Sequence, residues 1–172
     1  MSPRVHEAHQ TIEHVARTAY GRLVAYLSSR TRDVAAAEDA LGEALLEALA
    51  TWPKNGVPDK PEAWLLKAAQ HRLLDHQRHL RTQERHSETL RSMAAEVSAF
   101  EVADECPDER LRLFFVCAHP AIDVVVHAPL ILQVVLGLDA ARIAPAFLVS
   151  PATMSQRLVR AKTKIREAGI AF

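Results

Sequence analysis

Apolar residues recur every three or four positions through most of this chain, and that spacing is the period of an α-helix. The first such repeat runs from Thr11 to Ser29, and a second follows Asp33, a suitable N-cap residue. A third helix should begin at Pro61, because proline suits the first turn of a helix. No useful stretch alternates apolar and polar residues as a strand would. The sequence therefore predicts an all-α fold.

We expect two small helical domains joined by an acidic linker. Residues 1–90 should form a three-helix bundle, and residues 108–172 should form a second helical unit. Residues 91–107 form the expected linker, because acidic side chains dominate there. We expect Trp52-Pro53 to end the second helix, and Pro129 to lie in the first turn of a helix in the second unit.

Composition excludes several classes of protein. The chain has 172 residues, of which 49% are hydrophobic, and no run of 18 apolar residues that could span a membrane. The N-terminus lacks the apolar core of a signal peptide. Cys106 and Cys117 are too few for a disulfide scaffold, so we expect a cytoplasmic protein. The charges, 21 basic against 21 acidic, sum to zero, which at first argues against binding to nucleic acid.

The last part of the chain has the pattern of a helix-turn-helix. Asp139 can cap a short helix, a turn follows near Val149, and Ser150 and Pro151 suit the start of a second helix. The second helix carries an apolar face and a polar, basic remainder, with the apolar positions at Met154, Leu158, Ala161 and Ile165. A solvated amphipathic helix at a C-terminus is the simpler alternative.

The chain also resembles a known family. Residues 33–78 are similar to region 2 of an extracytoplasmic-function sigma factor, a small factor that directs bacterial RNA polymerase to promoters. The motifs that carry this similarity are Ala37-Glu38-Asp39-Ala40-Leu41, Glu43-Ala44, Trp52-Pro53, Gly56-Val57-Pro58, Pro61-Glu62-Ala63-Trp64-Leu65 and Arg72-Leu73-Leu74-Asp75. Region 4 of the family is resembled by Ala146-Phe147-Leu148-Val149 and Gln156-Arg157-Leu158-Val159-Arg160-Ala161-Lys162.

One branch of the family is resembled in particular, through Asp108-Glu109-Arg110-Leu111-Arg112-Leu113-Phe114 and Cys117-Ala118-His119-Pro120. Members of that branch usually continue into a long C-terminal helical extension, whereas this sequence ends at Phe172. Two further departures are Gly42, where the family often has Gln or Asp, and His71, where it often has Asn. The second of these weakens any transfer of base preference.

The resemblance implies a transcription initiation factor with neither enzymatic activity nor a cofactor. Its second helix would dock on the clamp helices of the largest catalytic subunit of the polymerase, through Asp33, Glu38, Asp39, Glu43 and Glu47. An acidic face suits a basic partner surface and repels DNA. Other partners that the resemblance implies are the flap of the second subunit, promoter DNA, and an anti-sigma factor or the family's own extension.

Two DNA contacts are implied as well. The third helix and the loop before it would open the −10 element and hold an extruded base, through Lys54, Asn55, Lys60, Lys67, His71, Arg72 and Arg78. The last helix would contact the −35 element in the major groove, through Ser150, Thr153, Ser155, Gln156, Arg157, Arg160 and Lys164. We interpret Trp52 and Trp64 as core residues, because both fall in the apolar periodicity. Asp75 is expected to pair with Arg72 or Arg78.

Three alternatives are open. His76 and His79, with Asp75, have a spacing that can bind a metal, although no third ligand is fixed nearby and basic neighbours disfavour a cation. A stand-alone helix-turn-helix repressor would share the C-terminal pattern, and a sigma-like decoy would share the protein-binding helix.

The zero net charge does not exclude binding to DNA, contrary to the first impression. It is a sum of alternating acidic and basic blocks, which suits a protein that contacts both polymerase and DNA.

Overall fold

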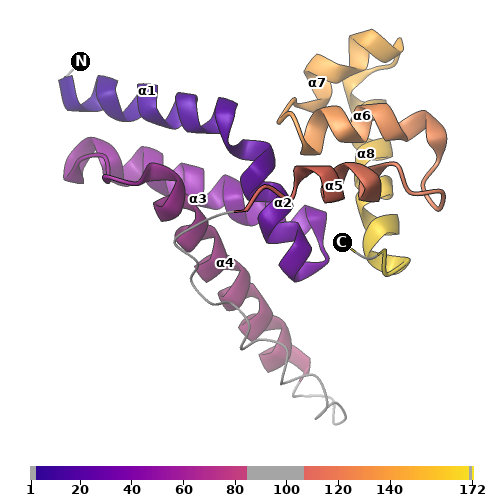
Figure 1. The fold of residues 1–172 in the computed structure, drawn as a ribbon, viewed down its shortest axis with the longest axis horizontal. Coiled ribbons are helices and arrows are strands. Elements are labelled where there is room, and N and C mark those ends of the chain that lie inside the picture. The colour runs from indigo at the N-terminus through magenta and orange to yellow at the C-terminus, as the bar shows by residue number, and fades with distance from the viewer. Residues whose placement is uncertain (1–2, 85–106, 171) are drawn as a thin grey trace.

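The computed structural model describes residues 3–84, 107–170 and 172, and every element in these ranges is a helix (Figure 1). The prediction of an all-α fold is confirmed. In chain order the elements are α1 (Pro3–Thr18), α2 (Tyr20–Thr31), α3 (Val34–Asn55), α4 (Pro61–Glu84), α5 (Arg110–Cys117), α6 (Val124–Val134), α7 (Ala140–Ile143), the 3₁₀ helix η2 (Ala144–Phe147) and α8 (Pro151–Glu167). The predicted linker, 91–107, lies outside the described residues except for Pro107.

Four helices, rather than the expected three, make up residues 3–84, because the first predicted helix is divided at Ala19. The backbone there, with φ −113° and ψ −11°, leaves the helical path before α2 begins. α1 and α2 each pack against α3, which requires a change of direction between them. Ile12, Val15 and Leu23 are all buried, so the apolar repeat continues through the break. The sequence pattern therefore did not reveal the break.

The ends of α3 are fixed by Asp33 and Gly56. The Ala36 N–H donates to the Asp33 carboxylate at 3.1 Å, so Asp33 is the N-cap residue, as predicted. The prediction that Pro53 ends the helix is wrong, since α3 continues to Asn55. Gly56, at φ 93°, takes a backbone conformation that L side chains rarely adopt, and there the helix ends.

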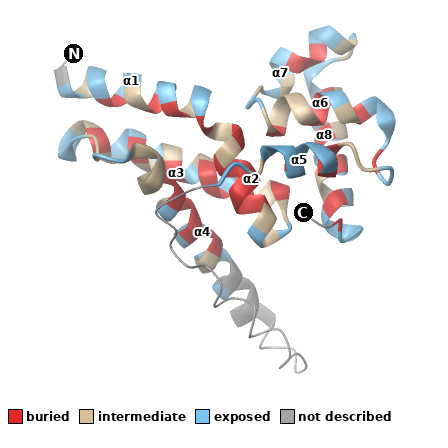
Figure 2. Ribbon diagram, in the orientation of Figure 1, coloured by how far each residue is buried: buried red, intermediate tan, exposed pale blue. Residues whose placement is uncertain are grey.

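The second group of helices, α5 to α8, packs around an apolar centre in which Leu113, Leu130, Ile143 and Met154 are fully or almost fully buried (Figure 2). Pro129 does not lie in the first turn as predicted. α6 begins five residues earlier, at Val124, because the carboxylate of Asp123 accepts a hydrogen bond from the Val125 N–H at 3.0 Å.

The C-terminal end of α6 and the turn into α8 follow the sequence prediction more closely. Gly137 has φ 69°, as a helix stop requires, and Asp139 caps α7 by accepting from the Arg142 N–H at 2.9 Å. η2, which contains Pro145, follows, and Leu148 then turns the chain at φ 54°. None of the described helices is long and apolar enough to cross a membrane.

The two groups of helices lie against each other through α2. Seven of its twelve residues, Gly21 and the run from Leu23 to Ser28, are buried, which is more than one face of a helix. α3 covers one side of α2 and α5 covers another, while α8 reaches α3 (Figure 1). This contact brings the start of α3 next to α8.

Candidate functional site

Four of the five acidic residues predicted to dock on polymerase fall into two pairs that face different neighbours. Glu43 and Glu47 face α4, where Arg72 reaches both carboxylates: its Nη2 lies 3.0 Å from Glu47 Oε2 and its Nε lies 3.6 Å from Glu43 Oε2. Asp33 and Glu38 face α8 instead. The five residues predicted to dock on polymerase therefore do not form one free acidic face.

Among the five residues predicted to dock on polymerase, Asp39 is exposed and has no ion pair in the described part of the chain. Glu38 is the opposite case, because only 10% of its side chain is exposed. Its Oε2 lies 2.8 Å from Lys162 Nζ on α8, and its Oε1 accepts a hydrogen bond from the Tyr20 hydroxyl at 3.4 Å. Glu38 is thus engaged within the molecule through both oxygens.

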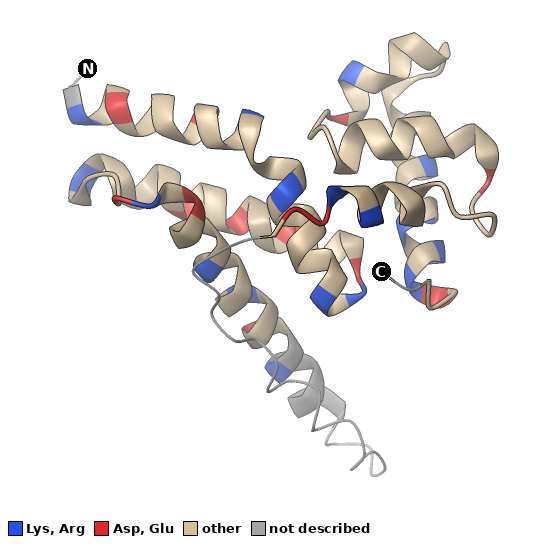
Figure 3. Cartoon of the chain, in the orientation of Figure 1, with Lys and Arg blue, Asp and Glu red and all other residues tan. Residues whose placement is uncertain are grey.

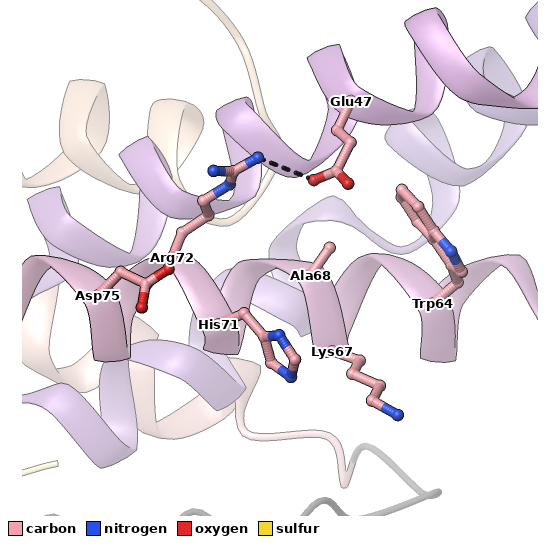
Figure 4. A pocket seen from close by; sticks show the side chains of 7 residues that line it. All are labelled: Glu47, Trp64, Lys67, Ala68, His71, Arg72 and Asp75. Carbon is pink, nitrogen blue, oxygen red and sulfur yellow. Dashed lines mark hydrogen bonds and ion pairs between the residues drawn. The ribbon is translucent and has the colours of Figure 1, made fainter.

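A hollow lies between α3 and α4, and Figure 4 shows the seven residues that line it: Glu47, Trp64, Lys67, Ala68, His71, Arg72 and Asp75. Arg72 points across to Glu47, while Lys67 and His71 leave α4 on another side. The hollow therefore combines an aromatic wall with cationic, imidazole and carboxylate groups. An aromatic ring beside cationic groups suits a stacked, unpaired base.

Trp64 forms that aromatic wall, although the sequence pattern indicates a core residue. It is half-buried, and its ring meets the ring of Trp52 edge-on with a centroid distance of 5.4 Å. Trp52 is only 2% exposed and does belong to the core. The apolar periodicity could not separate these two tryptophans, because both lie on the side of their helix that faces its neighbour.

The residues predicted for the −10 contact occupy two places. Lys67, His71 and Arg72 line the hollow, whereas Lys54 and Asn55 lie in the last turn of α3 and Lys60 stands just before α4. All six are exposed. Farther along α4, Arg78 lies 3.5 Å from Asp75, which is one of the two pairings expected for Asp75. Figure 3 shows lysines and arginines spaced along the coloured part of α4.

The first turn of α8 is built as the sequence predicts. The Thr153 N–H donates to Ser150 Oγ at 3.1 Å, and Pro151 occupies the first helical position. The four predicted apolar positions, Met154, Leu158, Ala161 and Ile165, are at most 6% exposed. Because Ser150 Oγ serves as the cap, it is partly committed to the helix before any DNA contact.

The polar residues of α8 divide into two flanks on either side of the apolar face. Positions separated by four, seven and eleven residues share a side of a helix. One flank, which we call the open flank, comprises Thr153, Arg157, Arg160 and Lys164. The other, the α3-side flank, comprises the polar residues Ser155, Lys162 and Arg166 together with the apolar Val159. Helical geometry thus separates Ser155 from the basic residues predicted to act with it, and leaves Gln156 exposed between the flanks.

Three residues of the open flank, Arg157, Arg160 and Lys164, line a second hollow together with the start of α6. The α6 side contributes the apolar residues Ile122, Val125 and Val126, and one carboxylate, Asp123. These three cations have no ion pair in the described part of the chain, in contrast to Lys162 and Arg166. The open flank is therefore the part of α8 available to phosphates.

Glu38 also influences the pKa values of two groups around it, Tyr20, which is partly buried, and Cys117, which is buried. Burial raises the pKa of Tyr20 well above its usual range, and the charge and hydrogen bond of Glu38 raise it further. Burial, followed by the charge of Glu38, raises the pKa of the Cys117 thiol to about 12, so the thiol is protonated at neutral pH. Away from this centre, the hydrogen bond from Arg110 lowers the pKa of Asp108 to about 2.

Sequence reasoning missed Tyr20, Gly21, Lys162 and Arg166, which join the two groups of helices. A basic residue on a polar helix face gives no signal of its partner when the partner is distant in sequence. In the described part of the chain, no three His, Cys, Asp or Glu side chains gather as metal ligands do.

Comparison with known proteins identifies part of this architecture. Residues 15–86 match the family model described as Sigma-70 region 2. An uncharacterized protein of Rhizobium meliloti (strain 1021) is 38% identical over 164 residues, an alignment that covers 90% of this chain. The chain spans 37% of the length of that curated relative. No solved structure matches the chain. The match to Sigma-70 region 2, which includes all of α2, α3 and α4, supports a factor of the sigma-70 family.

Proposed function

We propose that this protein is a transcription initiation factor that binds core RNA polymerase and directs it to the −10 and −35 elements of promoters. The observation that carries the proposal is the match of residues 15–86 to Sigma-70 region 2. That region implies binding to core polymerase, and it contains both the acidic helix α3 and the hollow between α3 and α4.

In this proposal α3 contacts the clamp helices of the largest catalytic subunit. Asp39 is exposed, and Glu43 and Glu47 are reachable because their pairing with Arg72 is solvent-exposed and therefore weak. A basic partner surface can replace Arg72 at little cost. The partner surface for α5 to α8 would be the flap of the second subunit.

The hollow between α3 and α4 would receive a base from the melted −10 element. Trp64 offers a ring for stacking, and Lys67 and His71 offer donors at its rim. Lys54, Asn55, Lys60 and Arg78 lie outside the lining and would contact the neighbouring backbone.

The −35 element would be contacted by α8. Thr153 and Gln156, near the start of the helix, would reach base edges, while Arg157, Arg160 and Lys164 would meet phosphates. Ser150 and Ser155 complete the proposed set. We further propose that the factor is of the extracytoplasmic-function type, acts in the cytoplasm, and has no enzymatic activity.

Charge reversal on α3 tests the proposal. Asp39→Lys with Glu43→Lys should abolish co-elution with core polymerase while leaving the helical circular dichroism spectrum unchanged. The matched control, Glu7→Lys with Glu13→Lys, makes the same change of charge on α1 and should bind core polymerase as the parent does. Equal binding by all three proteins would contradict docking through α3.

A stand-alone helix-turn-helix regulator is the second candidate, favoured by the capped α8 and its open flank. Such a regulator would dimerise and bind a palindromic duplex without polymerase. A monomer that binds promoter DNA specifically only together with core polymerase would exclude it.

A further inference from the structure

The hollow between α6 and α8, which we call the α6–α8 hollow, has an apolar half that the proposed function does not use. Its α8 side carries the three cations of the open flank. Its α6 side is an apolar wall that includes Ile122, Val125 and Val126. Contacts to DNA phosphates need hydrogen-bond donors and positive charge, and they do not need an apolar wall. The apolar half of the hollow therefore indicates a different ligand.

The size of the α6–α8 hollow fits a small molecule. Its volume is about 590 Å³, which lies within the range of small-molecule sites, roughly 300–1,000 Å³. Along α8 it extends from Arg157 to Lys164, a length of about 10 Å at the rise of an α-helix. A protein partner would need complementary surface of about 800 Å². The apolar wall, in contrast, is confined to the start of α6, so a short chain fits the hollow better than a protein does.

The apolar wall is held in place by hydrogen bonds of the Ile122 backbone. Its N–H donates to the carbonyl oxygen of His119 at 2.9 Å, and its own carbonyl oxygen accepts from His127 Nε2 at 2.9 Å. The next residue, Asp123, caps α6 by accepting a hydrogen bond from the Val125 N–H. The wall is therefore formed before a ligand arrives, and binding does not bear the cost of ordering it.

The charges in the hollow are unevenly placed. Its cations, Arg157, Arg160 and Lys164, all lie on α8 and have no ion pair in the described residues. The carboxylate in the lining, that of Asp123, lies at the start of α6. An anionic head group is thus attracted to α8 and repelled from α6, and arginine presents parallel N–H donors that match a carboxylate. The charges therefore orient an amphipathic anion with its head group on α8 and its chain on α6.

We propose that the α6–α8 hollow is a binding site for a medium-chain carboxylate, a short apolar chain that ends in a carboxylate group. The chain lies against the apolar wall, and the carboxylate lies among the three cations of α8. The same cations are assigned to the phosphates of the −35 element. To the extent that the inference rests on that proposed function, the carboxylate and −35 DNA compete for α8.

Isothermal titration calorimetry of the full chain with hexanoate, octanoate and decanoate tests the site directly. Each added methylene that is buried against the wall should raise the affinity about fourfold. Octanol has the chain of octanoate without the charge, and it should bind much more weakly. Equal affinities for hexanoate and decanoate, or for octanoate and octanol, would overturn the proposal.

Val125→Glu locates the ligand, because the new carboxylate would occupy the cations in place of the head group. We expect its affinity for octanoate to fall about tenfold or more. The matched control is Val124→Glu, since Val124 is the neighbouring residue, is 74% exposed and does not line the hollow. Val125 is 58% exposed, so both variants should keep the helical circular dichroism spectrum.

The control should bind octanoate as the parent does. Binding by Val125→Glu that equals binding by the parent would overturn the proposal. An equal loss of binding in both variants would place the ligand elsewhere and would overturn it as well.

The ligand site and the proposed function fail separately when −35 DNA is added. Fluorescence anisotropy of the polymerase-bound factor should show that octanoate, but not octanol, displaces the DNA. If octanoate binds the chain and no −35 DNA binds with or without polymerase, the proposed function is refuted and the ligand site stands. If the DNA binds, and octanoate either fails to bind the chain or binds without displacing the DNA, the ligand proposal is refuted and the proposed function stands.

Discussion

Asp33 performs two tasks with its two carboxylate oxygens. Oδ1 accepts the Ala36 N–H and begins α3, while Oδ2 lies 3.6 Å from Arg166 of α8. The cap needs only a short oxygen acceptor, whereas the ion pair needs a charge. Substitutions can therefore separate the two tasks.

We predict that Asp33→Ala lowers the free energy of unfolding by about 1 kcal/mol, the usual cost of losing an N-cap acceptor. Asp33→Ser, which keeps an acceptor but removes the charge, should lose less than half of that, because Arg166 is largely exposed and its pair is weak. Urea unfolding of both variants measures the difference. Equal losses would show that the charge, rather than the cap, is what stabilises α3.

Gly21 and Gly42 stand in helices for opposite reasons. Among the described residues, nothing beyond the nearby backbone of α3 lies within 4 Å of the position that a methyl group would take at Gly42, whereas at Gly21 the backbone of Val135 occupies that position. Gly42→Ala should therefore raise the free energy of unfolding by about 0.5–1 kcal/mol, the difference in helix propensity. Gly21→Ala should lower it, because the two groups of helices must separate. Urea midpoints compare the two, and stabilisation by Gly21→Ala would contradict the close approach.

At the scale of elements, the residues that begin α3, α7 and α8 could be predicted, whereas the start of α6 and the break between α1 and α2 could not. Asp33, Asp139 and Ser150 cap their helices as expected, since a capping side chain bonds within its own turn. The predictions from Pro53 and Pro129 were wrong, because Pro53 lies in the last turn of α3 and Pro129 lies beyond the first turn of α6. Each proline removes a single helical hydrogen bond, and packing can offset that loss.

In the candidate site, too, features set within one helix could be predicted, whereas features set by a neighbouring helix could not. The apolar face of α8 could be predicted from its period, and so could the basic character of α4. The division of α8 into an open flank and an α3-side flank could not, because it depends on which helix lies beside it. The position of Trp64 in the lining of a hollow could not be predicted either. It depends on where α3 lies, and the apolar periodicity of α4 carries no information about α3.

The open flank of α8 leads to a prediction about salt. Arg157→Gln with Arg160→Gln should weaken binding of the polymerase-bound factor to −35 DNA and reduce the steepness of log affinity against log salt by about two. Each arginine that neutralises a phosphate releases one counterion, which is the physical reason. Fluorescence anisotropy over a salt series measures the slope. Arg142→Gln is the control, and a slope equal to that of the parent in the double variant would contradict the phosphate contacts.

At the scale of the whole molecule, two of the acidic and basic blocks prove to contact each other, which the sequence alone did not reveal. The acidic start of α3 and the basic α3-side flank of α8 are partners within one chain. Their pairing joins residues too far apart in sequence for any local pattern to predict. The two groups of helices are therefore charge-complementary to each other where α8 meets the start of α3.

In the proposed function, this protein confers promoter specificity on core polymerase. Run-off transcription from the region upstream of its own gene, with core polymerase in the presence and absence of the protein, tests this role. We predict a discrete transcript only when the protein is present, and its loss with Asp39→Lys and Glu43→Lys. The absence of a specific transcript, together with no co-elution of the protein and core polymerase, would contradict the proposed function.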